Sequence, residues 1–360
     1  MPHSTRIPPL LQPCVRLPRE DALLLVTSTL GASANWLLVR YLCDALSTSN
    51  AADGGHGEEE SHNVVLVSWM REYEFWKHEA RKGAGLDLER LRKEGRFAFV
   101  DGLSGLCLED GEEQQHGADD SLRASSARAS TTLPNRGLPE VRTIPARGPR
   151  IPAAPTVDRT PVMNTLVDMA SPSKATTTRT GLHTLKSFDL IHLHTTITAA
   201  ISHLTSTSPT QRKTFVVLDN PDLLLALDST IAPSAMTSLL LTLHTLSTVS
   251  HVLTHIQADT PLLSLSTPPQ LLEVEHHNFL VKLAHMSTRV VSVRVLDTGV
   301  ARDVSGVLRC TEQRTGWLNL GLESGDKGPE DETGRGKEVL YQVKGDGSVK
   351  VFERGAGGET

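Results

Sequence analysis

The sequence predicts an α/β fold, in which helices flank a mostly parallel sheet. Short apolar runs bounded by turn-forming residues recur along the chain, which is typical of buried strands. Longer stretches with apolar residues at helical spacing lie between these runs. Strands that alternate with helices favour right-handed crossovers and parallel pairing. Near the end of the chain the pattern changes to strict alternation, and this predicts an antiparallel β extension.

The first predicted strand, 23–26, is too short for a helix and ends at the turn formers 27–29. After Gly31, apolar side chains from Trp36 to Leu46 recur at helical spacing. The further strands are predicted at residues 63–69, 97–103, 214–219 and 251–256. The further helices are predicted at 187–204, 232–249 and 270–286, with two short helices over 72–96 that break at 83–85 and end at Gly95.

The predicted antiparallel extension rests on three alternating segments. In 289–296, valines alternate with Ser292 and Arg294, and 304–311 and 339–352 alternate in the same way. Residues 344–347 (KGDG) suit a hairpin turn, because glycine and aspartate accept the backbone angles of such a turn.

Two segments lack the apolar periodicity that a folded core requires. Residues 109–180 are acidic at first and then rich in arginine, proline, serine and threonine, so they predict a long disordered insertion. Residues 321–336 have a similar composition. We therefore expect one interrupted domain, divided as follows: a flexible N-terminus (1–20), the first part of the domain (21–108), the insertion (109–180), the second part (181–320), a flexible loop (321–336), and a C-terminal hairpin and tail (337–360).

Composition excludes several classes of protein. The chain has 36 Lys and Arg against 42 Asp and Glu, a net charge of −6, which excludes a polybasic nucleic-acid-binding chain. No run of about 18 apolar residues is present, so no membrane span is expected. The proline-rich 1–20 has no apolar core of a secretory signal. The four cysteines form no C-x-x-C motif, which argues against a cysteine zinc site and for a reducing compartment.

The first strand–helix turn, 27–33, is where a phosphate-binding loop would lie. Gly31 fits the second glycine of the P-loop motif, and Ser33 fits the hydroxyl that binds magnesium. Ala32, however, stands where the motif requires lysine, and Thr27 and its neighbours replace the glycine-rich bend. The residues favour an ordinary strand–helix turn over nucleotide binding.

No complete catalytic or metal-binding motif appears. Asp219 ends an apolar strand, as the magnesium-orienting Asp of a Walker B motif does, but the sequence Asn220-Pro221-Asp222 also fits a simple turn and helix N-cap. His192 and His194, and the adjacent His276 and His277, lack the spacing of metal-binding helices. We therefore expect no catalytic residue, metal or cofactor.

Basic residues gather in 71–96, where eight Lys and Arg outnumber six acids by two. Within this segment, Arg71, Lys77, Arg81 and Lys82 are the candidate RNA-binding residues; the plainer interpretation is a solvated helical face with i, i+4 ion pairs. In the insertion, 121–150 holds six arginines and a single acid, and it would serve either as a phosphate clamp or as a solvated linker.

Taken in order, five segments resemble the Elongator complex protein 6 family, in a filamentous-fungus-like version. They are TSTLGASANWLL (27–38), VSWMREYEFW (67–76), KGAGLDL (82–88), FVDGL (99–103) and VVLDNPDLLLA (216–226). The likeness covers most of 21–103 and 187–296 and none of the insertion.

The resemblance implies a RecA-type ATPase fold without working Walker motifs. It also implies a hetero-hexameric ring with Elongator complex proteins 4 and 5, which joins the catalytic half of Elongator, binds tRNA and supports carboxymethyl-type modification of wobble uridines in the cytoplasm and nucleus. Active RecA-type enzymes carry a catalytic glutamate after the second strand. Here that strand runs into Ser68-Trp69-Met70, and Glu72 comes two residues late.

Two other classes stay open at this point. One is a RecA-type ATPase with an atypical phosphate loop, against which Ala32 argues. The other is a RecA-type DNA-binding recombinase paralogue, which a preference for single-stranded DNA over tRNA would distinguish.

Overall fold

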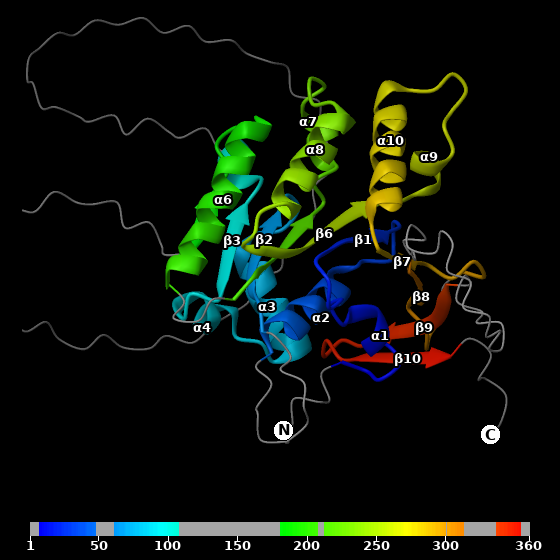
Figure 1. Ribbon diagram of the computed structural model, residues 1–360. Coiled ribbons are helices and arrows are strands. Elements are labelled where there is room, and N and C mark those ends of the chain that lie inside the picture. Colours follow the sequence, from blue (N-terminus) through cyan, green and yellow to red (C-terminus); the bar gives the residue numbers. More distant parts are fainter. Residues whose placement is uncertain are drawn as a thin grey trace, which may run out of the picture. The chain divides into compact units, whose positions relative to one another are not determined.

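A single ten-stranded sheet organises the chain (Figure 1). The computed structural model describes residues 7–47, 61–107, 181–207, 212–299, 301–312 and 336–353. The strand order is β10-β9-β8-β7-β1-β6-β5-β2-β3-β4. The predicted insertion (109–180) lies outside the described residues, as does the predicted loop 321–336 except for Gly336.

The parallel part of the sheet contains the strands that the sequence predicts. It consists of β1 (Ala22–Ser28), β2 (Asn63–Ser68), β3 (Phe97–Asp101), β4 (Leu182–Thr184), β5 (Thr214–Asp219), β6 (Val249–Gln257) and β7 (Arg289–Arg294). The first strand, β1, lies between β6 and β7, while β2 lies beyond β5. The predicted mostly parallel α/β fold is confirmed, and β4 is a short strand that its sequence did not indicate.

The antiparallel extension is confirmed but begins one strand later than predicted. It consists of β8 (Gly306–Glu312), β9 (Lys337–Val343) and β10 (Val349–Glu353). The alternating strand β7 instead pairs parallel with β1 on one side and antiparallel with β8 on the other. Alternation reports that a strand buries one face, and it does not distinguish the direction of the neighbouring strand.

Helices cover both faces of the sheet (Figure 1). One face carries α1 (Gln12–Val15), α2 (Asn35–Leu46), α3 (Tyr73–Ala84) and α4 (Leu88–Lys93). The other carries α6 (Leu190–Thr207), α7 (Leu223–Leu227), α8 (Pro233–His244) and α10 (Leu271–Met286). Two short helices, α5 (Ser104–Cys107) and α9 (Thr260–Leu263), complete the described set. Each face therefore has its own buried apolar cluster.

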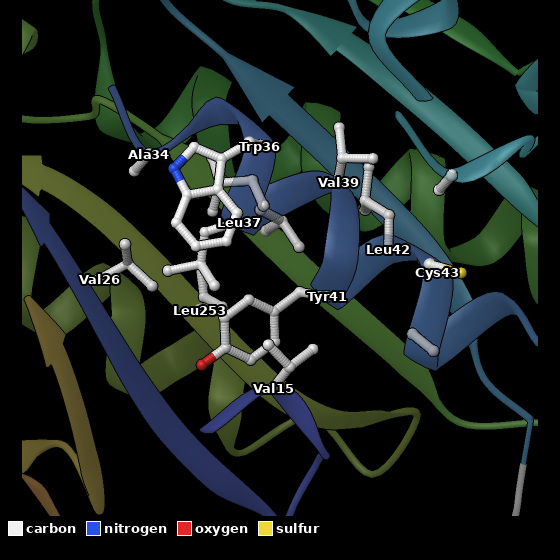
Figure 2. Close-up of a cluster of buried hydrophobic side chains, with 14 of the residues drawn as sticks. Val15, Val26, Ala34, Trp36, Leu37, Val39, Tyr41, Leu42, Cys43 and Leu253 are labelled. Carbon is white, nitrogen blue, oxygen red and sulfur yellow. The ribbon is translucent and has the colours of Figure 1, made fainter. Parts of the chain in front are cut away.

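The core of the first face is built around α2 (Figure 2). Tyr41 is fully buried, and its hydroxyl donates to Cys14 O at 2.8 Å. Trp36 packs against Tyr341 of β9 with ring centroids 4.8 Å apart. The helix thus joins the N-terminal segment to the C-terminal strands, which explains why nearly every side chain of α2 is buried.

Two predicted boundaries need correction. The N-terminus, expected to be flexible over 1–20, contains α1 in its described part, and Leu11 and Val15 are 0% exposed. The prolines of 1–20 disfavour a helix on sequence grounds. In the structure, the sheet and α2 bury the apolar side chains of the single turn α1. The helix predicted over 232–249 ends at His244, and β6 begins at Val249. The i, i+3 spacing of Leu243 and Leu246 carried the helical pattern past the true end.

Candidate functional site

The carboxyl ends of four neighbouring parallel strands bring polar residues together. Ser28 of β1 pairs in register with Gln257 of β6, and Asp219 of β5 pairs with Ser68 of β2 and His255 of β6. In open α/β sheets, ligands bind beyond the carboxyl ends of the strands. This edge is therefore the place to test for nucleotide chemistry.

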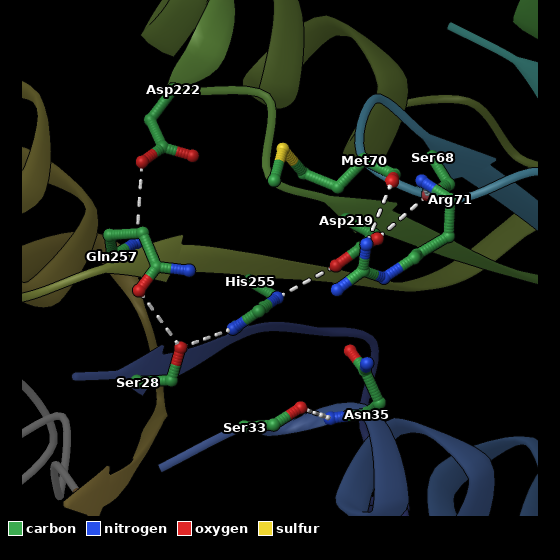
Figure 3. Close-up of polar contacts among 10 residues, drawn as sticks. All are labelled: Ser28, Ser33, Asn35, Ser68, Met70, Arg71, Asp219, Asp222, His255 and Gln257. Atoms are coloured by element: carbon green, nitrogen blue, oxygen red, sulfur yellow. Dashed lines mark hydrogen bonds and ion pairs between the residues drawn. The ribbon is translucent and has the colours of Figure 1, made fainter. Parts of the chain in front are cut away.

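A continuous hydrogen-bond network crosses this edge (Figure 3). The Asp219 carboxylate accepts from Ser68 Oγ at 2.7 Å and, through its other oxygen, from His255 Nδ1 at 2.8 Å. On the far side of the ring, His255 Nε2 and Ser28 Oγ are hydrogen-bonded at 2.9 Å. Because a carboxylate only accepts, the Nδ1 atom of His255 carries a proton. Both oxygens of Asp219 are therefore engaged by the chain's own side chains.

The order serine–histidine–aspartate is also that of a nucleophilic triad. Here, however, Ser28, His255 and Asp219 are 2%, 2% and 1% exposed. A nucleophile needs room for a substrate carbonyl and for donors that stabilise the developing oxyanion. Burial of the serine between strand ends leaves no such approach, and the arrangement is that of a satisfied internal network.

The degenerate phosphate loop is a closed turn. Ala32 N donates to Thr29 O at 2.9 Å, and Gly31 has φ +87°, a value that glycine adopts without strain. At its tip, Leu30 N donates to Asp259 Oδ1 at 2.7 Å. A phosphate loop directs such amides at phosphate oxygens, whereas here a carboxylate of the same chain holds one of them.

The remaining loop residues take positions in the core, at the start of α2 and within β1. Ala32 is 2% exposed, so a lysine at this position would have to enter the core. Ser33 Oγ accepts from Asn35 N at 3.3 Å at the start of α2, and Figure 3 shows it apart from the Asp219 network. Thr27 is a buried residue within β1.

The acidic residues near this edge take structural positions. Glu72 is exposed immediately before α3, and the buried Ser68 occupies the strand end instead. Asp222 stands at the N-cap of α7, as one interpretation of the sequence expected, but its side chain makes no cap. Its Oδ2 instead accepts from Gln257 N at 3.2 Å and pairs with His276 Nε2 of α10 at 3.0 Å.

The candidate RNA-binding residues lie on or just before α3. Arg71 stacks over Phe75, with 5.1 Å from its guanidinium carbon to the ring centroid. Lys77 pairs with Glu74 at 2.6 Å, so part of its charge is neutralised within the helix. Arg81 and Lys82 are exposed in the last turn. Three of the four cations are therefore spread along α3, while Arg71 precedes the helix and its backbone N donates to Ser68 Oγ of the Asp219 network at 3.1 Å.

Sequence reasoning missed three of the four network residues: His255, Ser68 and Ser28. Their signal was weak, because each is a common residue at a strand end. His251 and His255, four apart in a strand, do share one face. Only the register of β5 against β6 shows that the second histidine reaches Asp219.

Within the described ranges, no group of three or more His, Cys, Asp or Glu side chains could hold a metal ion. None of the described helices has the length and apolarity required to cross a membrane. Cys14, Cys43 and Cys310 are buried, and none of the three forms a disulfide.

Comparisons with known proteins add one structural likeness. No protein-family model matches the chain, and no curated protein matches it. Among solved structures, the chain is similar to a KaiC-like protein from the hyperthermophilic archaeon Pyrococcus horikoshii. That likeness covers 97% of each chain, at 11% identity and a TM-score of 0.44. The fold class itself rests on the strand order and registers given above.

Proposed function

We propose that this chain is a RecA-like subunit that carries out no nucleotide chemistry and serves as a non-catalytic member of the Elongator accessory ring. One observation carries the first half of the proposal: both Asp219 oxygens are bonded within the chain, to Ser68 and His255. A Walker-B-type carboxylate must instead be available to magnesium and its water ligands.

The loop supports the same conclusion. ATP binding needs backbone amides and a lysine to neutralise the phosphates. Here Asp259 holds the Leu30 amide, and Ala32 replaces the lysine. To bind here, a nucleotide would have to displace the buried Asp219 network and bring its phosphates close to the Asp259 carboxylate. Residues 27–33 contain no cation that could offset these costs.

The Elongator assignment rests on where the resembling segments fall. Segments 27–38, 67–76 and 216–226 span the junctions β1–α2, β2–α3 and β5–α7, which are carboxyl-end connections of the sheet. These are the places where RecA-like domains keep their functional loops, so the resemblance lies in the distinctive part of the chain. The localisation that follows from this assignment is the cytoplasm and the nucleus.

In this proposal the partners are Elongator complex proteins 4 and 5, in a hetero-hexameric ring that joins the catalytic half of Elongator. Head-to-tail packing would give each subunit two different faces, and such contacts close into a ring. With a net charge of −6, this chain binds tRNA weakly by itself. The exposed Arg71, Arg81 and Lys82 would add to basic surfaces of the partners.

Mass spectrometry of tRNA nucleosides from a deletion strain tests this function. We expect the carboxymethyl-type wobble uridines to disappear and to return when the full chain is re-expressed. The catalytic half of Elongator should stay assembled in the deletion strain. Normal levels of these nucleosides would contradict the assignment. ATP turnover by the purified chain, or preference for single-stranded DNA over tRNA, would favour the ATPase or recombinase alternative.

A further inference from the structure

At the amino ends of the strands, opposite to the site described above, three polar side chains stand in a row: Arg96, Asn63 and Thr214. Val64 N donates to Arg96 O at 2.9 Å, which places the start of β2 against the residue that precedes β3. On the other side, Asn63 pairs in register with Thr214 of β5, and Asn63 N donates to Lys213 O at 3.0 Å.

The three side chains share one face of the sheet. Each lies two residues before a residue of the apolar cluster under α6 and α8: Ala98, Val65 and Val216, respectively. Since alternate residues of a strand point to the same side, the row belongs to this face. The end of α6 approaches it, because a Cβ on Gly95 would lie 2.6 Å from Thr207 Cγ2.

The polar atoms of the row are buried and unpartnered. Arg96 is 8% exposed, and Asn63 and Thr214 are 0% exposed. Arg96 Nε and Nη2, both amide atoms of Asn63, and Thr214 Oγ1 are buried with no hydrogen-bond partner. Native structures satisfy nearly all buried polar groups, so adjacent unsatisfied groups call for an explanation.

The electrostatic surroundings of the row are positive. Burial lowers the pKa of Arg96, and the nearby Arg212 and Arg90 lower it further, while Glu94 opposes them. Glu94 is already paired with Arg90 at 3.1 Å. Arg96 therefore keeps its buried charge without a dedicated carboxylate partner among the described residues.

We propose that Arg96, Asn63 and Thr214 form a binding site for a small oxyanion of the phosphate class. The guanidinium offers two neighbouring donors, which suit two oxygens of one phosphate. Asn63 Nδ2 and the Thr214 hydroxyl add donors, and Asn63 Oδ1 can accept the hydroxyl proton of hydrogen phosphate. The burial of the row excludes a nucleotide base or a nucleic-acid strand as the ligand. This site is separate from the degenerate loop and does not depend on the proposed function.

Titration of the full-length chain with sodium phosphate, by calorimetry and thermal unfolding, tests the site, with sodium chloride at equal ionic strength as the reference. We expect saturable binding and a rise in Tm with phosphate alone. Arg96→Met should weaken the affinity by about tenfold or more, because a charge-assisted pair is lost. Thr214→Val, which keeps the shape, should weaken it by about threefold to tenfold.

The matched control is Arg81→Met, which removes an exposed arginine of α3, on the opposite face of the sheet. This variant should bind phosphate like the wild type. Arg96→Met should also fold in phosphate-free buffer, since an apolar side chain replaces an uncompensated buried charge. If phosphate gives no saturable effect beyond that of chloride, or if Arg96→Met and Thr214→Val bind it as the wild type does, the proposal is wrong.

Discussion

Asp219 and His255 are register partners on the adjacent strands β5 and β6, and their side chains meet at 2.8 Å inside the protein. The pair joins two further strands, because Ser68 bonds the carboxylate from β2 and Ser28 bonds the imidazole from β1. Four strand ends are thus tied by side chains at the carboxyl edge of the parallel sheet, where open α/β sheets bind ligands.

His255→Leu should lower the free energy of unfolding by about 3 kcal/mol, because it leaves a buried carboxylate without one of its two donors. Urea denaturation at pH 7 measures the loss. His78→Leu, at an exposed position of α3, is the control and should change stability by less than about 0.5 kcal/mol. Equal stability of the two variants would show that the network contributes little.

Arg40 ties the C-terminal hairpin to the helical layer, and this contact depends on glycine. Its Nη2 donates to Gly347 O at 3.0 Å. Gly347 has φ +80°, and a Cβ there would lie 2.9 Å from Gly83 Cα. Gly347→Ala should therefore cost roughly 1–3 kcal/mol of stability, from backbone strain and overpacking.

Gly345→Ala provides the matched control for this hairpin. It lies in the same turn, and a Cβ there meets nothing within 4 Å. Thermal unfolding should show a lower Tm for Gly347→Ala and no loss for Gly345→Ala. Equal Tm values for the two variants would mean that the turn moves freely against α3.

His251 should make the protein less stable as pH falls. Burial, aided by the nearby His62, His244 and Lys213 and opposed by Asp21, lowers its pKa from 6.5 to about 4. Because the unfolded chain takes up this proton first, stability is lost as pH falls from 6.5 to about 4. The full effect of this shift is about 3 kcal/mol.

Urea unfolding of the wild type and of His251→Phe over this pH range isolates the contribution of His251. The variant keeps an aromatic ring next to Phe215, which lies 6.3 Å from the imidazole. We expect a flatter stability profile for His251→Phe. Profiles with the same slope would show that His251 does not titrate with the lowered pKa.

Ala32→Lys should not create ATP binding. The backbone amide of residue 32 donates to Thr29 O and closes the turn. Because this position is buried, a lysine side chain would have to carry its charge into the core. Equilibrium binding of Mg-ATP to the purified chain measures this. Leu30→Lys is the matched control for Ala32→Lys: it adds the same charge to the same loop, at a position that is 85% exposed. Stoichiometric ATP binding by the wild type or by Ala32→Lys would contradict the structural argument.

Charge reversal on α3 should weaken tRNA binding by the proposed ring with Elongator complex proteins 4 and 5. The combined change of Lys77, Arg81 and Lys82 to Glu removes three candidate phosphate contacts. The slope of log affinity against log salt should fall by up to about 2–3. Lys350→Glu, an exposed cation on β10, is the control. An unchanged slope in the triple variant would remove α3 from the tRNA-binding surface.

The fold was largely predictable because its signals are local. Apolar runs such as 63–69 and 214–219 became β2 and β5 with small changes at their ends. One error arose at His244, where the apolar spacing of α8 continues into the residues that lead to β6. Another arose at Leu11, because the short turn that contains it is stabilised by residues far away in the sequence. The parallel pairing of β7 was missed because alternation reports burial and not direction.

The site was predictable only in part. Ala32 and Asp219 could be identified from their places in a known pattern. The role of His255 depends on the register of two strands, and the bond from Leu30 to Asp259 depends on residues 229 positions apart. Such contacts come from the assembled sheet and leave no spacing in the sequence to detect.

Affinity purification of the tagged full-length chain from its source, followed by mass spectrometry, tests the central claim most directly. We predict stoichiometric recovery of Elongator complex proteins 4 and 5, with the catalytic subunits of Elongator present and lost first as salt rises. Recovery of the chain alone, or with partners that include no Elongator subunit, would contradict the account.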